Sequence, residues 1–143
     1  MTPITHLLHS APIRYGAAIS WTLYFTMLLL QPADQLPVAS LLPQGDAAML
    51  LREVIFSVGH LVAFFILAFL WFHALRPQQW RSLWQIAALL LVYALCTEFA
   101  QTLTPGRAAQ WNDLAGNLGG ILLAMRVYAS RFEIPMSRIT PQR

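Results

Sequence analysis

Charged residues are scarce in this chain of 143 residues, because Asp, Glu, Lys and Arg together make up 10% of it. Soluble globular proteins carry about 25%, so a surface that faces water cannot be built from this composition. Lysine is absent, and all nine basic residues are arginines. Hydrophobic residues reach 57% and gather in long runs with almost no charge, which is the pattern expected when lipid is the solvent. We therefore expect an all-α polytopic membrane protein.

Cysteine is nearly absent as well. The single Cys96 lies inside an apolar run, which excludes an intrachain disulfide and a thiolate metal cluster. Imidazole and carboxylate groups suit Zn²⁺ or Mn²⁺, so His60, Glu98 and Asp113 are one alternative set of metal ligands. The chain has no short histidine pair of the H-x-x-x-H type, however, so we expect neither a metal nor another cofactor. The arginines are spread along the ends of the apolar runs, and we expect no nucleic-acid partner.

Four apolar runs predict four transmembrane helices, at about residues 15–30, 54–75, 83–103 and 113–129. Prolines mark their ends, at Pro32, Pro77 and Pro105, because proline cannot continue a helix. We expect one membrane domain over residues 1–129, with an extramembrane loop between the first two helices. Residues 130–143 hold three arginines and two prolines, and we expect them to form a basic tail near anionic lipid.

The arginines also predict the orientation. Seven lie on one side of the predicted helices and two on the other; the two are Arg52 and Arg107. Cytoplasmic loops carry the positive excess in membrane proteins, so both termini are expected in the cytoplasm of a bacterium, with the chain crossing the plasma membrane several times. Trp80, Trp84 and Tyr128 would then lie at the inner interface and Trp111 at the outer one.

Polar residues inside the predicted helices are costly in lipid and need a partner or a purpose. The third helix has Glu98 and Gln101 on one face. The fourth helix has polar and small residues at helical spacing, namely Asp113, Gly116, Asn117 and Gly120, opposite Leu114, Leu118, Ile121 and Met125. We expect the second set to face lipid. The two glycines would let the third helix approach closely, so that Glu98 faces Asn117.

The second helix carries Ser57, His60 and Phe64 on one face. At about 1.5 Å per residue, His60, Glu98 and Asn117 lie at a similar depth in the outer leaflet. The sequence therefore predicts an outward-facing polar cluster formed by three helices.

These residues also carry a resemblance to a known family. The run from Phe56 to His60, then Glu98-x-x-Gln101, Pro105-Gly106-Arg107 and Asp113-x-x-x-Asn117-x-Gly119 resemble the motifs of the VanZ-like family. The chain departs from them at Ser57, where relatives often have a basic residue, and at Phe64, where they have Tyr. The resemblance implies a small polytopic membrane protein, some of whose relatives are associated with resistance to glycopeptide antibiotics such as teicoplanin.

Two functions fit this cluster. In the first, it binds an anionic membrane lipid such as a polyprenyl-phosphate or a lipid-linked cell-wall precursor. Arg107 would take the phosphate, His60 and Glu98 are the candidates for acid–base catalysis, and the other ligand-binding candidates are Gln101, Asp113, Asn117 and Ser57. In the second, the cluster only stabilises helix packing, and the protein is an accessory subunit that docks to envelope enzymes. A proton-coupled transporter ranks third, because the inner halves of the helices hold almost no polar residues.

Overall fold

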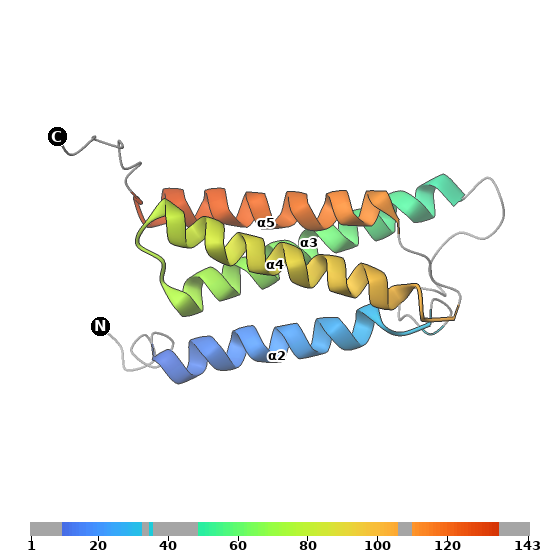
Figure 1. Cartoon of the computed structure of the whole chain (residues 1–143), viewed down its shortest axis with the longest axis horizontal. Coiled ribbons are helices and arrows are strands. Elements are labelled where there is room, and N and C mark those ends of the chain that lie inside the picture. Colours follow the sequence, from blue (N-terminus) through green and yellow to red (C-terminus); the bar gives the residue numbers. More distant parts are fainter. Residues whose placement is uncertain (1–9, 33–34, 36–48, 106–109, 135–143) are drawn as a thin grey trace.

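The computed structural model describes residues 10–32, 35, 49–105 and 110–134. This part of the chain is all-helical and has no strand. The helices are α2 (Ala11–Leu29), α3 (Met49–Leu75), α4 (Trp80–Gln101) and α5 (Trp111–Arg131). Successive helices run in opposite directions, so that α2 and α4 begin at the end of the bundle where α3 and α5 finish (Figure 1). The prediction of four helices is confirmed.

The helix bounds differ from the predicted ones mainly at the amino-terminal ends. The second helix starts at Met49 rather than Val54, so Arg52, which was expected in a loop, is helical. The first starts at Ala11 with a proline in its first turn, where the missing N–H has no intrahelical partner to lose. The last extends to Arg131, and Ile134 beyond it is buried against the core. The rest of the predicted tail lies outside the described residues.

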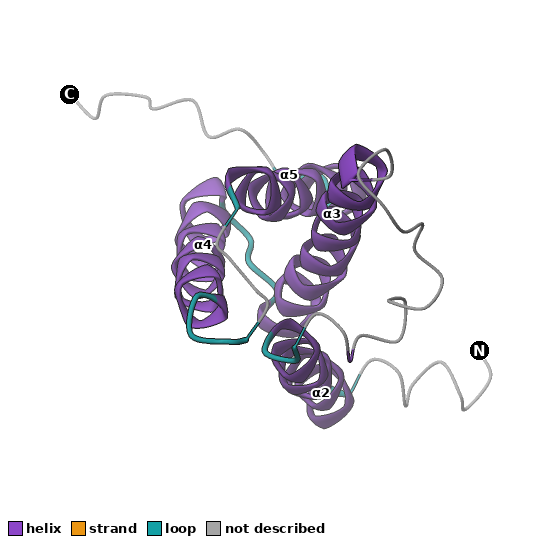
Figure 2. Cartoon of the chain, turned by 90° about the vertical axis from the view of Figure 1, so that its right-hand side faces the viewer, coloured by secondary structure: helices purple, strands orange, loops and turns teal. Residues whose placement is uncertain are grey.

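The helices surround one apolar core (Figure 2). Its fully buried side chains include Phe64, Phe72, Leu83, Ile121 and Tyr128. The most extensive helix contact is between α3 and α5, which lie side by side over much of their length.

The glycine face of α5 packs against α3. A Cβ atom added at Gly116 would lie 2.6 Å from the carbonyl oxygen of Ser57, and one added at Gly120 would lie 2.8 Å from the backbone nitrogen of Phe65. Both contacted backbones belong to α3, so the expectation that this face approaches α4 is wrong. Because glycine has no side chain, Gly116 and Gly120 let the α3 backbone approach α5 this closely.

Two other expectations for α5 are also wrong. Ile121 and Met125, which were expected to face lipid, are buried in the core. Tyr128, which was expected at the membrane interface, is 1% exposed and packs on Phe72 and Phe132. Because α5 contacts both α3 and α4, less of its circumference is exposed than the two-sided pattern suggests.

Helix α2 is held to the bundle by side-chain hydrogen bonds as well as by apolar contacts. The indole N–H of Trp71 donates to the hydroxyl of Thr22 at 3.1 Å, and the hydroxyls of Thr26 and Tyr93 are 2.7 Å apart. Hydroxyl groups on an apolar helix thus find partners on α3 and α4, as buried polar groups require.

Two of the helices are long and apolar enough to cross a membrane. The most apolar 18-residue stretch of Leu50–Leu75 has a mean hydropathy of 2.4, and 28% of that stretch is buried in the protein. The corresponding stretch of Trp80–Gln101 has a mean hydropathy of 1.7, and 33% of it is buried. Most of this apolar surface is therefore exposed, with Leu50 at 73% and Leu89 at 70%. The core helix of a soluble protein would bury such residues, so both helices have the character of membrane helices.

Candidate functional site: a buried polar cluster

Buried polar side chains gather at one end of the bundle. Within the described ranges they are His60, Thr97, Glu98, Gln101, Asp113 and Asn117. They come from the first half of α3, the last turns of α4 and the first turns of α5, which meet at the same end (Figure 1). The predicted convergence of three helices is thus seen in the structure. We call His60, Glu98, Asp113 and Asn117 the polar cluster.

Asn117 lies at the centre of the polar cluster and is 0% exposed. Its side-chain NH₂ donates to Glu98 Oε1 at 3.2 Å, and its Oδ1 is 2.9 Å from His60 Nδ1. The predicted pairing of Glu98 with Asn117 is therefore correct. Because the amide NH₂ can only donate and the amide oxygen can only accept, this arrangement places the His60 proton on Nδ1 and leaves Nε2 available.

His60 stands between two carboxylates. Its Nδ1 is 3.8 Å from Glu98 Oε1 and its Nε2 is 3.7 Å from Asp113 Oδ2. The side chains of all three residues are at most 8% exposed. Two carboxylates and one imidazole leave a negative excess in any state with both acids ionised, and burying such an excess is costly. The polar cluster is therefore suited to hold protons or a cation.

The carboxyl of Glu98 is only partly satisfied. Its Oε1 accepts from Asn117, and the backbone N–H of Gln110 also faces the carboxyl. Its Oε2 is buried and has no hydrogen-bond partner among the residues that the structure describes. A buried carboxylate oxygen in this condition is uncommon and calls for a proton or a ligand.

Asp113 is held by the start of α5. It is the third residue of this helix and the acid in its first turn, where the helix dipole favours negative charge. The N-cap residue is Gln110, which makes no side-chain capping bond, so Asp113 is not the capping residue. Nearby, the Ser57 hydroxyl donates to the carbonyl of Asn112 at 2.8 Å and ties α3 to this turn.

One predicted ligand-binding residue, Gln101, makes its hydrogen bond outside the polar cluster. The side-chain amide of Gln101 donates to the carbonyl oxygen of Leu29 at 3.1 Å, so it joins the end of α4 to the end of α2. Arg107 lies outside the described residues.

The structure adds one neighbour that the sequence analysis did not name. The ring of Phe25 on α2 meets the His60 imidazole edge-on, with ring centroids 6.5 Å apart. Phe25 is 7% exposed and lies on one face of α2 with Ala18 and Leu29, both buried. The spacing of seven and four residues places these three apolar side chains on one face of α2. This pattern could have predicted from the sequence that Phe25 packs against a neighbouring helix.

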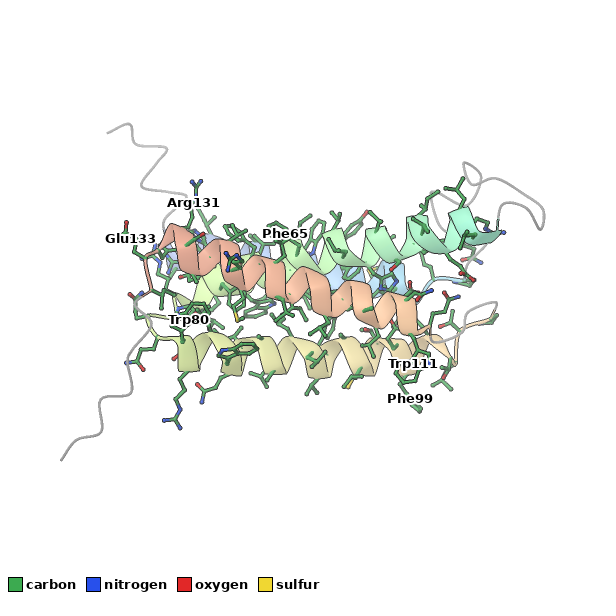
Figure 3. The ribbon with its side chains drawn as sticks, turned by 90° about the horizontal axis from the view of Figure 1, so that it is seen from above. Phe65, Trp80, Phe99, Trp111, Arg131 and Glu133 are labelled. Carbon is green, nitrogen blue, oxygen red and sulfur yellow. The ribbon has the colours of Figure 1, made fainter. Side chains whose placement is uncertain are left out.

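A groove opens beside the polar cluster between α4 and α5. Its volume is about 320 Å³, and its lining is mostly apolar, with Glu98 among the polar groups. Phe99 and Trp111 stand at this end of the bundle on the same side (Figure 3), and they are 70% and 86% exposed. The groove therefore connects a buried carboxylate with an aromatic-lined, apolar surface.

The chain was compared with protein families, curated proteins and solved structures. Residues 14–132 match the model of the VanZ/LLP1 family. The chain belongs to the VanZ/LLP1 family. No significant match was found among curated proteins or among solved structures. The VanZ/LLP1 match spans all four helices and so includes α2, which contributes Phe25 to the surroundings of His60.

Proposed function

We propose that this VanZ/LLP1 protein crosses the bacterial plasma membrane four times and binds an anionic envelope lipid at its outward-facing end. The ligand class is a polyprenyl-phosphate or a lipid-linked cell-wall precursor. The proposal rests on one juxtaposition, that of the buried polar cluster and the apolar groove whose lining includes Glu98. A lipid chain can occupy such a groove while its headgroup meets polar side chains.

The four-span arrangement is supported by exposure. Helices α3 and α4 have membrane character, and α2 exposes Leu23 at 62% and Met27 at 68%. Apolar side chains this exposed are favourable where the surroundings are lipid. Helix α5 is the least apolar, yet it packs along α3 and needs less contact with lipid.

The described part of the site carries two carboxylates, which would repel a phosphate. Binding of a phosphate headgroup therefore requires a positively charged residue nearby. Arg107 stands in the sequence between α4 and α5, whose adjoining ends flank the groove. An arginine guanidinium can bind a phosphate through two parallel hydrogen bonds. We therefore assign the phosphate to Arg107, and acid–base work on the headgroup, if it occurs, to His60 and Glu98.

The experiment is mass spectrometry of the lipids that co-purify with the protein. Wild type is compared with Arg107→Ala, with Glu98→Gln and with Arg126→Ala, a control at an exposed arginine on the opposite end of α5. All four are extracted at matched yield. We expect an anionic lipid to be enriched with wild type and Arg126→Ala and to be lost from Arg107→Ala.

The alternative function predicts a different pattern. If the protein is an accessory subunit whose polar cluster is structural, no lipid is enriched and the variants at Arg107 and Glu98 differ from wild type only in yield or stability. That result would overturn the lipid-binding proposal and would favour a search for envelope proteins that co-purify with the chain.

The resemblance to VanZ-like proteins extends the proposal to glycopeptide resistance. Expression in a teicoplanin-susceptible host should raise the inhibitory concentration of teicoplanin. The Glu98→Gln variant at equal protein level should give less protection if proton transfer matters, and equal protection if Glu98 only accepts hydrogen bonds, since the amide still pairs with its neighbours.

A further inference from the structure

We propose that His60, Glu98 and Asp113 form a binding site for one divalent transition-metal ion, with Zn²⁺ and Mn²⁺ as the candidates. One ligand atom from each of the three residues lies within 4.8 Å of the others. Ligand atoms around one tetrahedral ion with bonds of about 2.0–2.2 Å lie roughly 3.3–3.6 Å apart. Small side-chain rotations therefore suffice to bring the three atoms onto one ion. The sequence analysis named the same three residues as an alternative ligand set but expected no metal, because the chain has no short ligand pair of the H-x-x-x-H type. The structure brings the three residues together from three helices.

The tautomer of His60 fits a metal ligand. Nδ1 donates to the amide oxygen of Asn117, which leaves the lone pair of Nε2 available 3.7 Å from Asp113 Oδ2. Metal-binding histidines are commonly oriented in this way, with the other ring nitrogen donating to an oxygen of the protein. Asn117 is thereby a positioning residue, which orients both His60 and Glu98 through its two hydrogen bonds.

The charge and the hydrogen bonding of the polar cluster also support a metal site. The polar cluster brings two carboxylates together with side chains at most 8% exposed, and a divalent cation would neutralise them. Glu98 Oε2 is buried without a hydrogen-bond partner among the described residues, which is the condition of an oxygen available to a cation. Imidazole and carboxylate together suit Zn²⁺ and Mn²⁺ better than Ca²⁺, which takes six to eight oxygen ligands.

Three protein ligands leave coordination positions open, as in catalytic rather than purely structural zinc sites. The groove beside Glu98 gives these positions access from the side of Phe99 and Trp111. The metal site itself does not depend on lipid binding, so it can be tested on protein from which lipid has been removed.

The test is metal titration of the purified full-length protein in detergent after treatment with a chelator. Zn²⁺ is titrated by calorimetry into wild type, Glu98→Gln and Asp113→Asn. The controls are Glu53→Gln, which changes an acid on α3 outside the polar cluster, and His6→Ala/His9→Ala, which removes two other histidines. We expect one ion per chain, with affinity reduced by about tenfold or more in the two cluster variants and unchanged in the controls.

A second measurement covers the case in which a cluster variant fails to fold. Pulsed electron paramagnetic resonance of Mn²⁺ bound to the wild-type protein and to His6→Ala/His9→Ala should show the ¹⁴N coupling of one imidazole. Absence of stoichiometric binding of either ion to wild type, or equal affinity in folded Glu98→Gln and Asp113→Asn, would overturn the proposal and leave the two acids to be neutralised by protons. Loss of lipid enrichment with intact metal binding would contradict the proposed function alone.

Discussion

At the scale of single residues, Asn117 determines how the polar cluster is arranged. Its amide satisfies one atom of His60 and one of Glu98 at the same time, and it is 0% exposed. Only a side chain with one donor end and one acceptor end can bridge a histidine N–H and a carboxylate in this manner. Glu98 and His60 could be identified from the sequence because such groups are costly in lipid. The bridging role of Asn117 could not, because it depends on the distances between the helices.

Replacing Asn117 with leucine tests this role. Asn117→Leu keeps the branched shape and the number of side-chain heavy atoms but removes the partner of the buried His60 N–H and one donor to the buried Glu98 carboxyl, and each lost partner costs about 1–3 kcal/mol. We expect a clear fall in the thermal unfolding midpoint measured in detergent. The matched control is Asn112→Leu, because Asn112 is exposed on the same helix and its contact to Ser57 uses the backbone carbonyl. Equal midpoints for the two variants would contradict the bridging role.

At the scale of helices, glycine has opposite effects at two positions. Gly120 lies against the α3 backbone, so a methyl group there would meet Leu61 and Phe65. Gly59 has nothing within 4 Å of an added Cβ. We expect Gly120→Ala to destabilise the protein by about 1–3 kcal/mol through overpacking, and Gly59→Ala to stabilise it by about 0.5–1 kcal/mol through helix propensity.

Denaturation curves of the two alanine variants beside wild type measure this difference. An increase in stability for Gly120→Ala would mean that α3 and α5 are farther apart than the structure places them. Gly119→Ala is an intermediate control, because its added atom would meet one flexible leucine side chain at 3.6 Å.

The helices and their packing show what the sequence alone could and could not predict. Apolar run lengths predicted four helices, and the spacing of Glu98, Asp113 and Asn117 predicted which faces are polar. The spacing of Gly116 and Gly120 identified a face for close approach but not the helix that approaches it. The short connection favoured α4 as the neighbour, whereas the structure places α3 there, in a contact between residues far apart in sequence that local periodicity does not encode.

Exposure on α5 was mispredicted for a related reason. A helix with one polar and one apolar face is expected to turn the apolar face to lipid when a single neighbour covers the polar one. Ile121 and Met125 are buried because α5 contacts two helices. The number of neighbours around a helix is a property of the assembled bundle.

At the scale of the whole molecule, charge is distributed unequally between the two ends. Five described arginines lie toward one end of the bundle, near the start of α2, just after α3, at the start of α4 and in the last turns of α5. They are Arg14, Arg76, Arg81, Arg126 and Arg131. Arg52 lies near the start of α3, at the opposite end, where the polar cluster is also found. Trp80 and Trp111 mark the two ends (Figure 3). Because arginines are retained on the cytoplasmic side, we predict from this asymmetry that the polar cluster faces outward.

Single cysteines at the two ends measure the orientation directly. In a Cys96→Ala background, which removes the native exposed thiol, Asn112→Cys and Gln79→Cys each introduce an exposed thiol at one end. A membrane-impermeant maleimide should label Asn112→Cys on spheroplasts and Gln79→Cys only after permeabilisation. The reverse pattern would place the polar cluster on the cytoplasmic side. It would contradict the outward orientation and would require the headgroup to be sought among inner-leaflet lipids.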